Sequence, residues 1–71
     1  MQWIETPESS NVKRFKYDAG KRELVIEFGS GGVYRYSEVP FEVFDGMKDA
    51  ESKGRFFHRV IRGVYAFGKI G

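Results

Sequence analysis

The stretch VKRFKYDAGKRELVIEFGSGGVYRYS, residues 12–37, decides the fold of this chain. Within it, apolar and polar residues alternate in three runs, at residues 12–17, 23–28 and 33–37. A period of two residues indicates β-strands. The runs are separated by Asp18–Arg22 and Gly29–Gly32, whose composition is typical of turns. Because turns this short join antiparallel neighbours, the stretch predicts a three-stranded antiparallel β-meander.

One face of this predicted sheet is apolar, and the other alternates in charge. The apolar face holds Phe15, Tyr17, Leu24, Ile26, Phe28, Tyr34 and Tyr36. The charged face holds Val12, Arg14, Lys16, Glu23, Val25, Glu27, Val33 and Arg35. On the charged face, cations can flank the two glutamates across the strands. We therefore expect the apolar face to pack against the rest of the chain.

After the third strand the period changes to 3.6 residues, which indicates helices. Val39-Pro40 ends the strand and starts a helix, because proline suits the first helical turn. The apolar face of this helix consists of Val43, Phe44, Met47 and Ala50. Ser52 is a good N-cap for a second helix. Its apolar arc consists of Phe56, Phe57, Val60, Ile61 and Val64, and Gly63 is expected to end it.

These patterns predict an α+β fold of the order β-β-β-α-α, in which two helices cover one face of a three-stranded sheet. Val64–Phe67 is expected to run extended after the second helix. The predicted core consists of Phe15, Leu24, Ile26, Phe28, Phe44, Phe57, Val60 and Ile61. Each of these large side chains would lose about 1.5–3 kcal/mol of burial free energy if it stayed exposed.

Length and composition restrict the class of protein. With 71 residues, of which 41% are hydrophobic and 17% aromatic, the chain predicts one folded domain at residues 12–71. Residues 1–11 are polar and predict a flexible leader, with Trp3 and Ile4 as its anchors. The absence of cysteine excludes a disulfide scaffold and thiolate chemistry. No apolar run reaches the roughly 20 residues of a membrane span or resembles a signal peptide, so we expect a cytoplasmic protein with no membrane partner.

Charge is sorted along the chain, although the net charge is only +2. Residues 13–22 carry five cations and one carboxylate, residues 42–51 carry one cation and four carboxylates, and residues 53–71 carry five cations and no carboxylate. Basic blocks attract polyanions over a Debye length of about 8–10 Å. The alternative is that the acidic and basic segments face each other within the fold.

The second helix carries the main candidate nucleic-acid interface. Arg55, Arg59 and Arg62 recur at a spacing that places them on one helix face, and arginine binds phosphate through two parallel hydrogen bonds. The alternative is an ordinary solvated helix face. A second basic group, in the first strand, consists of Lys13, Arg14 and Lys16.

The start of the second helix is a further candidate for phosphate contact. Lys53 and Gly54 follow Ser52, and this combination suits an anion at the free backbone N–H groups of a helix start. The alternative is that Ser52 caps the helix and Gly54 is needed for close packing on a neighbouring segment.

Tyr34 and Tyr36 are candidates for stacking on nucleobases, because aromatic residues two apart on a sheet face can do so. The alternative is that they belong to the core or its rim, with their hydroxyl groups in water. The apolar face that they share with the other strands favours the core.

Catalysis has little support in the sequence. His58 has no cysteine and no adjacent serine to activate. Asp45 and Asp49 alone supply too few oxygen ligands for a hard metal ion. The glycine-rich segment 29–32 lacks the Lys-Ser/Thr ending of a phosphate-binding P-loop. We expect a non-enzymatic protein without metal or cofactor.

An ordered set of residues resembles the KTSC domain family. The set consists of Tyr17-Asp18, Leu24, Phe28, Gly32, Tyr34-x-Tyr36, Val39-Pro40, Ala50-x-Ser52-x-Gly54, Phe56-Phe57 and Ile61-Arg62, and the resemblance covers roughly residues 10–65. This family is a short domain appended to the C-terminus of some lysyl-tRNA synthetases and also found alone in bacterial and phage proteins. The resemblance implies a domain of unknown function for which RNA binding has been proposed, with no catalytic or binding residues to carry over.

Two functions therefore remain open at the level of sequence. The first is weak binding of RNA or single-stranded nucleic acid with little sequence preference, through the basic helix. The second is a protein-interaction or self-associating module, in which helix faces of opposite charge pair between chains or Trp3 and Ile4 contact a partner.

Overall fold

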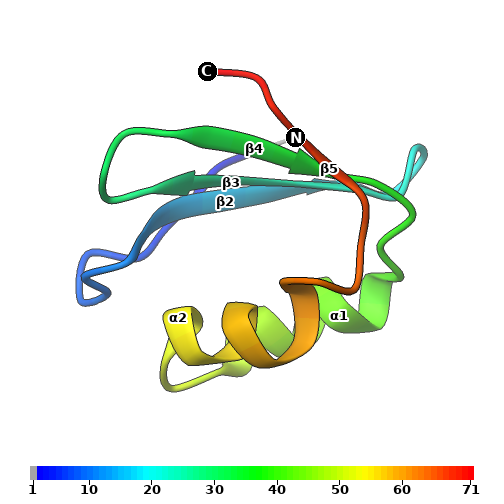
Figure 1. The fold of residues 1–71 in the computed structure, drawn as a ribbon. Helices are drawn as coiled ribbons and strands as arrows, with labels where there is room; N and C mark the ends of the chain where they lie inside the picture. The colour runs from blue at the N-terminus through cyan, green and yellow to red at the C-terminus, as the bar shows by residue number, and fades with distance from the viewer. Residues whose placement is uncertain (1) are drawn as a thin grey trace.

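The computed structural model describes residues 2–71 and places the helices together on one face of a single antiparallel sheet (Figure 1). The elements follow one another as β1 (Ile4–Glu5), β2 (Val12–Asp18), β3 (Glu23–Phe28), β4 (Val33–Tyr36), α1 (Phe41–Asp49), α2 (Lys53–Phe56), the π-helical turn η1 (Phe57–Ile61) and β5 (Phe67–Lys69). The α+β class and the two helical segments are thus confirmed.

The sheet has five strands in the order β1-β2-β3-β4-β5, so the predicted number of three was wrong. The predicted meander is its centre, β2 to β4, and one short strand is added at each edge. Part of the predicted leader forms β1, in which Ile4 lies opposite Phe15 of β2. At the other edge the chain returns from the helices, and Phe67 lies opposite Tyr36. Strands of two and three residues are too short to show a periodicity.

The strand register confirms the predicted apolar face with one exception. Phe15 lies opposite Ile26, and Ile26 opposite Tyr34, all on the side of the helices. Val12 was expected on the charged face but is fully buried in the core. A β-bulge shifts the register between Val12 and Arg14, and a bulge reverses the side on which the preceding residue lies.

Val25 departs from the expected pattern in a different way. It lies on the charged face as predicted, yet it is only 6% exposed. Its cross-strand neighbours are Lys16 and Arg35, and long cationic side chains cover apolar surface with their aliphatic stems. The central strand is therefore buried on both faces.

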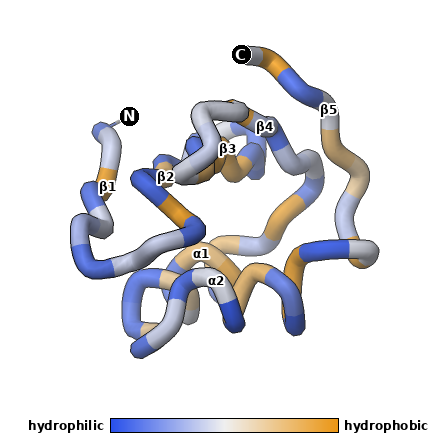
Figure 2. Tube along the Cα trace, turned by 60° about the vertical axis from the view of Figure 1, so that its left-hand side comes forward, coloured by the Kyte–Doolittle hydropathy of each residue, from blue (hydrophilic) through white to orange (hydrophobic). Residues whose placement is uncertain are grey.

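The core lies between the sheet and the helices. It consists of Val12, Phe15, Leu24, Ile26, Tyr36, Val39, Met47, Phe57 and Ile61. Three predicted core residues, Phe28, Phe44 and Val60, are half-buried and pack against it. In Figure 2 the hydrophobic parts of the helices lie on the turns toward the sheet, and the hydrophilic parts lie on the outer turns.

The second helical segment begins as predicted and ends earlier than its apolar arc suggested. Ser52 is the N-cap, and its Oγ accepts a hydrogen bond of 3.2 Å from the N–H of Arg55. At the other end the N–H of Arg62 donates to the carbonyl of Phe57 at 2.9 Å, which closes a π-type turn. Gly63 then takes a positive φ of 78° and redirects the chain. Val64, predicted in the apolar arc, lies beyond this turn and is exposed.

Residues 10 and 11 lie between the sheet and α2, and two glycines allow this approach. A Cβ atom at Gly29 would lie 2.7 Å from the carbonyl oxygen of Ser10, and one at Gly54 would lie 2.7 Å from Nδ2 of Asn11. Real side chains do not approach this closely. Gly54 thus allows close packing against the Asn11 side chain, which was the alternative to an anion site at the helix start.

We predict that Gly29→Ala destabilises the domain by about 1–3 kcal/mol, because the added methyl group meets backbone that cannot move without disturbing β2. Gly68→Ala is the matched control, since nothing lies within 4 Å of a Cβ there, and its effect should stay within about 0.5 kcal/mol. Urea denaturation of the two variants measures the difference. Equal midpoints for both would contradict the packing described.

Candidate functional site

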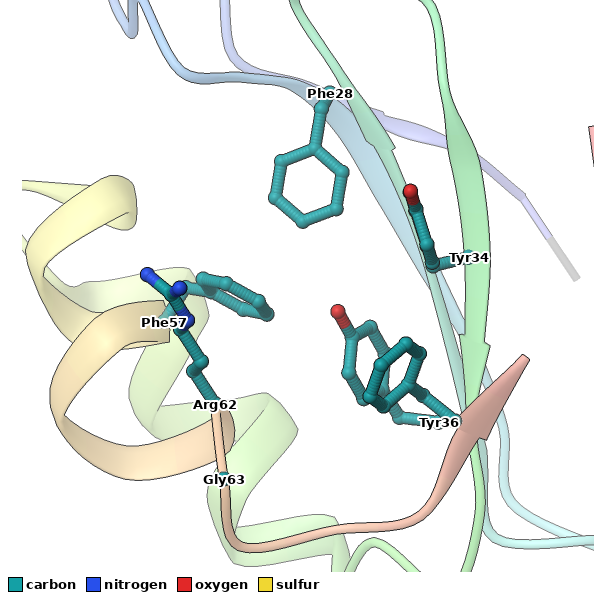
Figure 3. Close-up of a pocket in the computed structure, with 7 residues that line it drawn as sticks. Phe28, Tyr34, Tyr36, Phe57, Arg62 and Gly63 are labelled. Carbon is teal, nitrogen blue, oxygen red and sulfur yellow. The ribbon is translucent and has the colours of Figure 1, made fainter. Parts of the chain in front are cut away.

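An aromatic pocket of about 500 Å³ lies between the sheet and the end of η1 (Figure 3). Its lining residues come from β3, β4, β5 and the helical end: Phe28, Tyr34, Tyr36, Phe57, Arg62, Gly63 and Phe67. We call this the aromatic pocket. Five of its seven lining residues are aromatic, and none is acidic.

The aromatic rings form a connected set around the pocket. The ring of Phe57 lies 5.0 Å from that of Phe28 and 5.6 Å from that of Tyr36, both in edge-to-face contact. From the sheet edge, the ring of Phe67 lies 5.6 Å from Tyr36 and 5.9 Å from Tyr34. Phe67 is nevertheless 63% exposed. A ligand in the pocket could therefore cover one large apolar ring that the fold itself leaves in water.

The hydroxyl group of Tyr36 is available to form a hydrogen bond with a ligand in the pocket. Tyr36 is only 4% exposed, and within residues 2–71 its hydroxyl makes no hydrogen bond. By contrast, the hydroxyl of Tyr17 donates to the carbonyl of Val39. Figure 3 shows the Tyr36 hydroxyl directed into the space between the rings. Burial raises the pKa of Tyr36, Tyr34 adds to the rise, and Arg62 partly opposes it, so the hydroxyl is protonated at neutral pH.

Arg62 supplies positive charge at the helical side of the pocket. Its guanidinium lies beside Phe57 in Figure 3, and its Nη1 is 3.2 Å from Nδ1 of His58. No carboxylate of residues 2–71 lies within 4 Å of it. Arg62 thus places a cation on the helical side of the pocket, and Tyr34 and Tyr36, the predicted stacking residues, line the sheet side.

Arg55 and Arg59 lie together at a different place, on the groove between α1 and α2. Asp49 and Glu51 line the same groove, so the predicted approach of acidic and basic segments occurs. In the described part of the chain, however, neither arginine forms an ion pair within 4 Å. Both remain exposed, and their guanidinium groups are available to a phosphate.

The start of α2 is occupied by contacts within the protein. The Lys53 ammonium donates to the carbonyls of Lys48 and Ala50, at 2.9 and 2.6 Å, at the end of α1. Gly54 is buried against Asn11. Both residues were candidates for phosphate contact, and the structure gives each a role in joining segments of the fold.

The second basic group lies on the face of the sheet opposite the helices and is largely paired. Nε of Arg14 lies 2.6 Å from a carboxylate oxygen of Glu27, and Nζ of Lys13 lies 3.8 Å from the other. The hydrogen bond from Arg14 is the main cause that lowers the pKa of Glu27. Arg14 and Lys16 also lie over the ring of Trp3, at 4.2 and 4.3 Å. This group therefore does not extend the surface formed by the arginines of the helices.

Sequence reasoning identified Tyr34, Tyr36 and Arg62 but missed the pocket that joins them. Phe28 and Phe57 were predicted only as core residues, and Phe67 only as part of an extended segment. The pairing of β5 with β4 brings Phe67 to the pocket. A three-residue strand that joins the sheet only after the helices leaves no signal in the local sequence.

The remaining sequence candidates do not assemble into a further site. Within residues 2–71 no group of three or more histidine, aspartate and glutamate side chains is arranged to hold a metal ion. His58 is exposed and contacts Arg62. None of the helices described has the length and apolar character needed to cross a membrane.

Comparison with known proteins identifies a matching family, similar sequences and a similar structure. A family model described as the KTSC domain matches residues 8–65. The lysine–tRNA ligase of Trichormus variabilis is 38% identical over 64 residues, which are 90% of this chain and 11% of that protein. An uncharacterized protein of Stutzerimonas stutzeri is 40% identical over 55 residues, 78% of each chain. The crystal structure of a KTSC domain protein from Yersinia pestis superimposes with a TM-score of 0.93 at 38% identity and covers 99% of this chain and 97% of that one.

We predict that Tyr36 makes the domain sensitive to alkaline pH. Because its pKa is raised in the folded state, the unfolded chain loses this proton first, and stability falls as the pH rises above the ordinary tyrosine value of about 10. Tyr36→Phe should lose less stability than the wild type between pH 8 and 11 in denaturant titrations. Tyr65→Phe, outside the pocket, should keep the wild-type loss. An unchanged alkaline loss in Tyr36→Phe would contradict this assignment.

Proposed function

The chain belongs to the KTSC domain family, and from this premise we propose that it binds RNA or single-stranded nucleic acid, weakly and with little sequence preference. Relatives that contain a matching segment include lysine–tRNA ligases, which are named for an RNA substrate. This chain spans only 11% of their length, so the link to RNA supports the proposal without carrying over the ligase activity. We propose a cytoplasmic binding module rather than an enzyme.

The observation that carries this proposal is the state of the three helical arginines. Arg55, Arg59 and Arg62 are exposed, and no carboxylate within residues 2–71 lies within 4 Å of them. An arginine that is already paired offers little to phosphate, whereas a free guanidinium can bind phosphate through two parallel hydrogen bonds. Contacts of this kind position a nucleic acid without reading its sequence.

Other cations are poorer candidates for the same role. Lys53 is engaged by two carbonyls of α1, and Arg14 by Glu27. We therefore restrict the proposed phosphate contacts to Arg55 and Arg59, on the groove between α1 and α2, and to Arg62, at the aromatic pocket. Lys13, Arg14 and Lys16 lie on the far face of the sheet, where they contact Glu27 and Trp3.

A second function, self-association, is favoured by the edge strand β5. Its three residues are exposed, and an edge strand presents unpaired backbone groups to another chain. Phe67 and Ile70 add exposed apolar surface at this edge. A dimer formed there would grow with protein concentration, and analytical ultracentrifugation without nucleic acid measures it.

We predict that Arg55→Gln/Arg59→Gln weakens binding of single-stranded RNA for every sequence alike. If each arginine contacts one phosphate, the slope of log affinity against log salt should become shallower by about 1.4, since each contact on a single strand contributes about 0.7. Fluorescence anisotropy of labelled oligonucleotides at several salt concentrations measures both effects.

Lys21→Gln/Arg22→Gln is the matched control, because it removes the same charge from an exposed turn between β2 and β3. It should leave the salt slope close to that of the wild type. Equal effects of the two double variants would mean that only net charge matters, and the proposed interface would be wrong. Absence of binding by the folded wild type at low salt would reject the function itself.

A further inference from the structure

We propose that the aromatic pocket is a binding site for one nucleotide unit, with the base against the aromatic rings and the phosphate on Arg62. Where the nucleotide is part of a strand, this inference rests on the proposed function and names the place where one base is held. The same chemistry is also present in a free nucleotide, and the experiment below separates the two sources.

The size and lining of the pocket suit a planar ring. Its volume of about 500 Å³ lies within the range of roughly 300–1,000 Å³ typical of small-molecule sites. Phe57 and Phe28 hold the helical end of the pocket in edge-to-face contact, so its shape is set by packed side chains. Phe67 remains largely exposed at the mouth, where a bound base would cover it. Bases stack readily on aromatic side chains because every base has a π-face.

The hydroxyl groups favour a ring with polar edges over a purely apolar ligand. Tyr36 is almost fully buried as a residue, but no buried side-chain nitrogen or oxygen of residues 2–71 lacks a partner, so its unbonded hydroxyl is open to solvent in the pocket. An aliphatic ligand would remove that solvent and leave the hydroxyl unpaired, which is costly. The edge of a nucleobase offers the acceptors and donors that such a hydroxyl needs.

The charge of the lining indicates an anionic ligand. Aromatic boxes often bind quaternary ammonium groups, but in those sites the cation sits against the rings without competing positive charge. Here the one charged residue that lines the pocket is Arg62, and its guanidinium contacts the imidazole of His58 at 3.2 Å. An ammonium ligand would be repelled, whereas a phosphate beside the ring would meet the guanidinium.

The test is a titration of the wild-type chain with adenosine 5′-monophosphate, adenosine, inorganic phosphate and a single-stranded oligoadenylate, followed by amide chemical shifts. We expect the monophosphate to bind more tightly than adenosine or phosphate alone. We also expect the shifts to concentrate at Gly63 and Phe67 and to be smaller at Lys21, in the exposed turn between β2 and β3. This mapping uses no variant, so it does not depend on the folding of a mutant.

Two variants sharpen the test, each with a matched control. Phe67→Ala should weaken binding of the monophosphate and the oligonucleotide by about 5- to 160-fold, the range typical for loss of one stacking contact. Phe41→Ala removes a ring of α1 that is also largely exposed, at 50% against 63% for Phe67, and it should have little effect. Arg62→Gln should remove the preference for the monophosphate over adenosine, and Lys21→Gln, in the exposed turn between β2 and β3, should keep it.

The outcomes separate this inference from the proposed function. Binding of the monophosphate without binding of the oligonucleotide supports the pocket as a site for free nucleotides and rejects the proposed function. Binding of the oligonucleotide that depends on Arg55 and Arg59 but not on Phe67 supports the proposed function and overturns the pocket assignment. Shifts spread over the charged face of the sheet, or equal affinity for adenosine and its monophosphate, also overturn it.

Discussion

The ring of Phe57 joins the two layers of this small domain. It projects from the helical segment to the sheet and meets Phe28 of β3 and Tyr36 of β4, with ring centres 5.0 and 5.6 Å apart. The helices are short, and α2 and η1 together cover only residues 53–61. Segments of this length are not stable as isolated helices, so they depend on packing against the sheet. The position of Arg62, five residues after Phe57, depends on the same contact.

This arrangement makes one set of aromatic residues serve both stability and binding. Phe57 and Tyr36 belong to the core, yet they also line the aromatic pocket. A chain of this size buries only about 60% of the surface that it exposes when unfolded, so it has few residues that could be devoted to a site alone. The parts of the site that are free of the core are those at its margin: Arg62, Gly63 and Phe67. Of these three, Arg62 and Phe67 can be substituted most easily, because Gly63 holds a positive φ of 78° that strains other residues.

Much of the fold could be predicted from sequence because its central strands and helices obey simple periods. The alternation through β2 and β3 placed Phe15, Leu24 and Ile26 in the core, and Ser52 marked the start of the second helix. Val12 was misplaced because a β-bulge interrupts the period that the prediction assumed. Val64 was misplaced because the π-type turn and Gly63 end the helix before the apolar arc does.

The site was less predictable than the fold, for a related reason. Its chemistry was visible in single residues, such as Arg62 and Tyr36, but their proximity is a property of tertiary structure. Partners could not be inferred either: nothing in the local sequence shows that Lys53 binds the carbonyls of α1 or that Arg14 pairs with Glu27. Such contacts decide whether a cation is available to bind a ligand, and they cannot be inferred from the charge pattern along the chain.

The chain returns to the sheet only after the helices, and this affects the order in which the strand pairs separate on unfolding. Strand β5 is three residues long and fully exposed, and residues 37–66 separate it from its partner β4. Closing so long a connection costs chain entropy, which the backbone bonds of one short edge ladder offset only in part. The β4–β5 pairing, like the two-residue β1–β2 pairing at the opposite edge, should therefore open before the central β2–β3 ladder, which stays protected from hydrogen exchange. The mouth of the aromatic pocket is thus built on an edge ladder of the sheet, and exchange of a ligand needs only this edge to loosen.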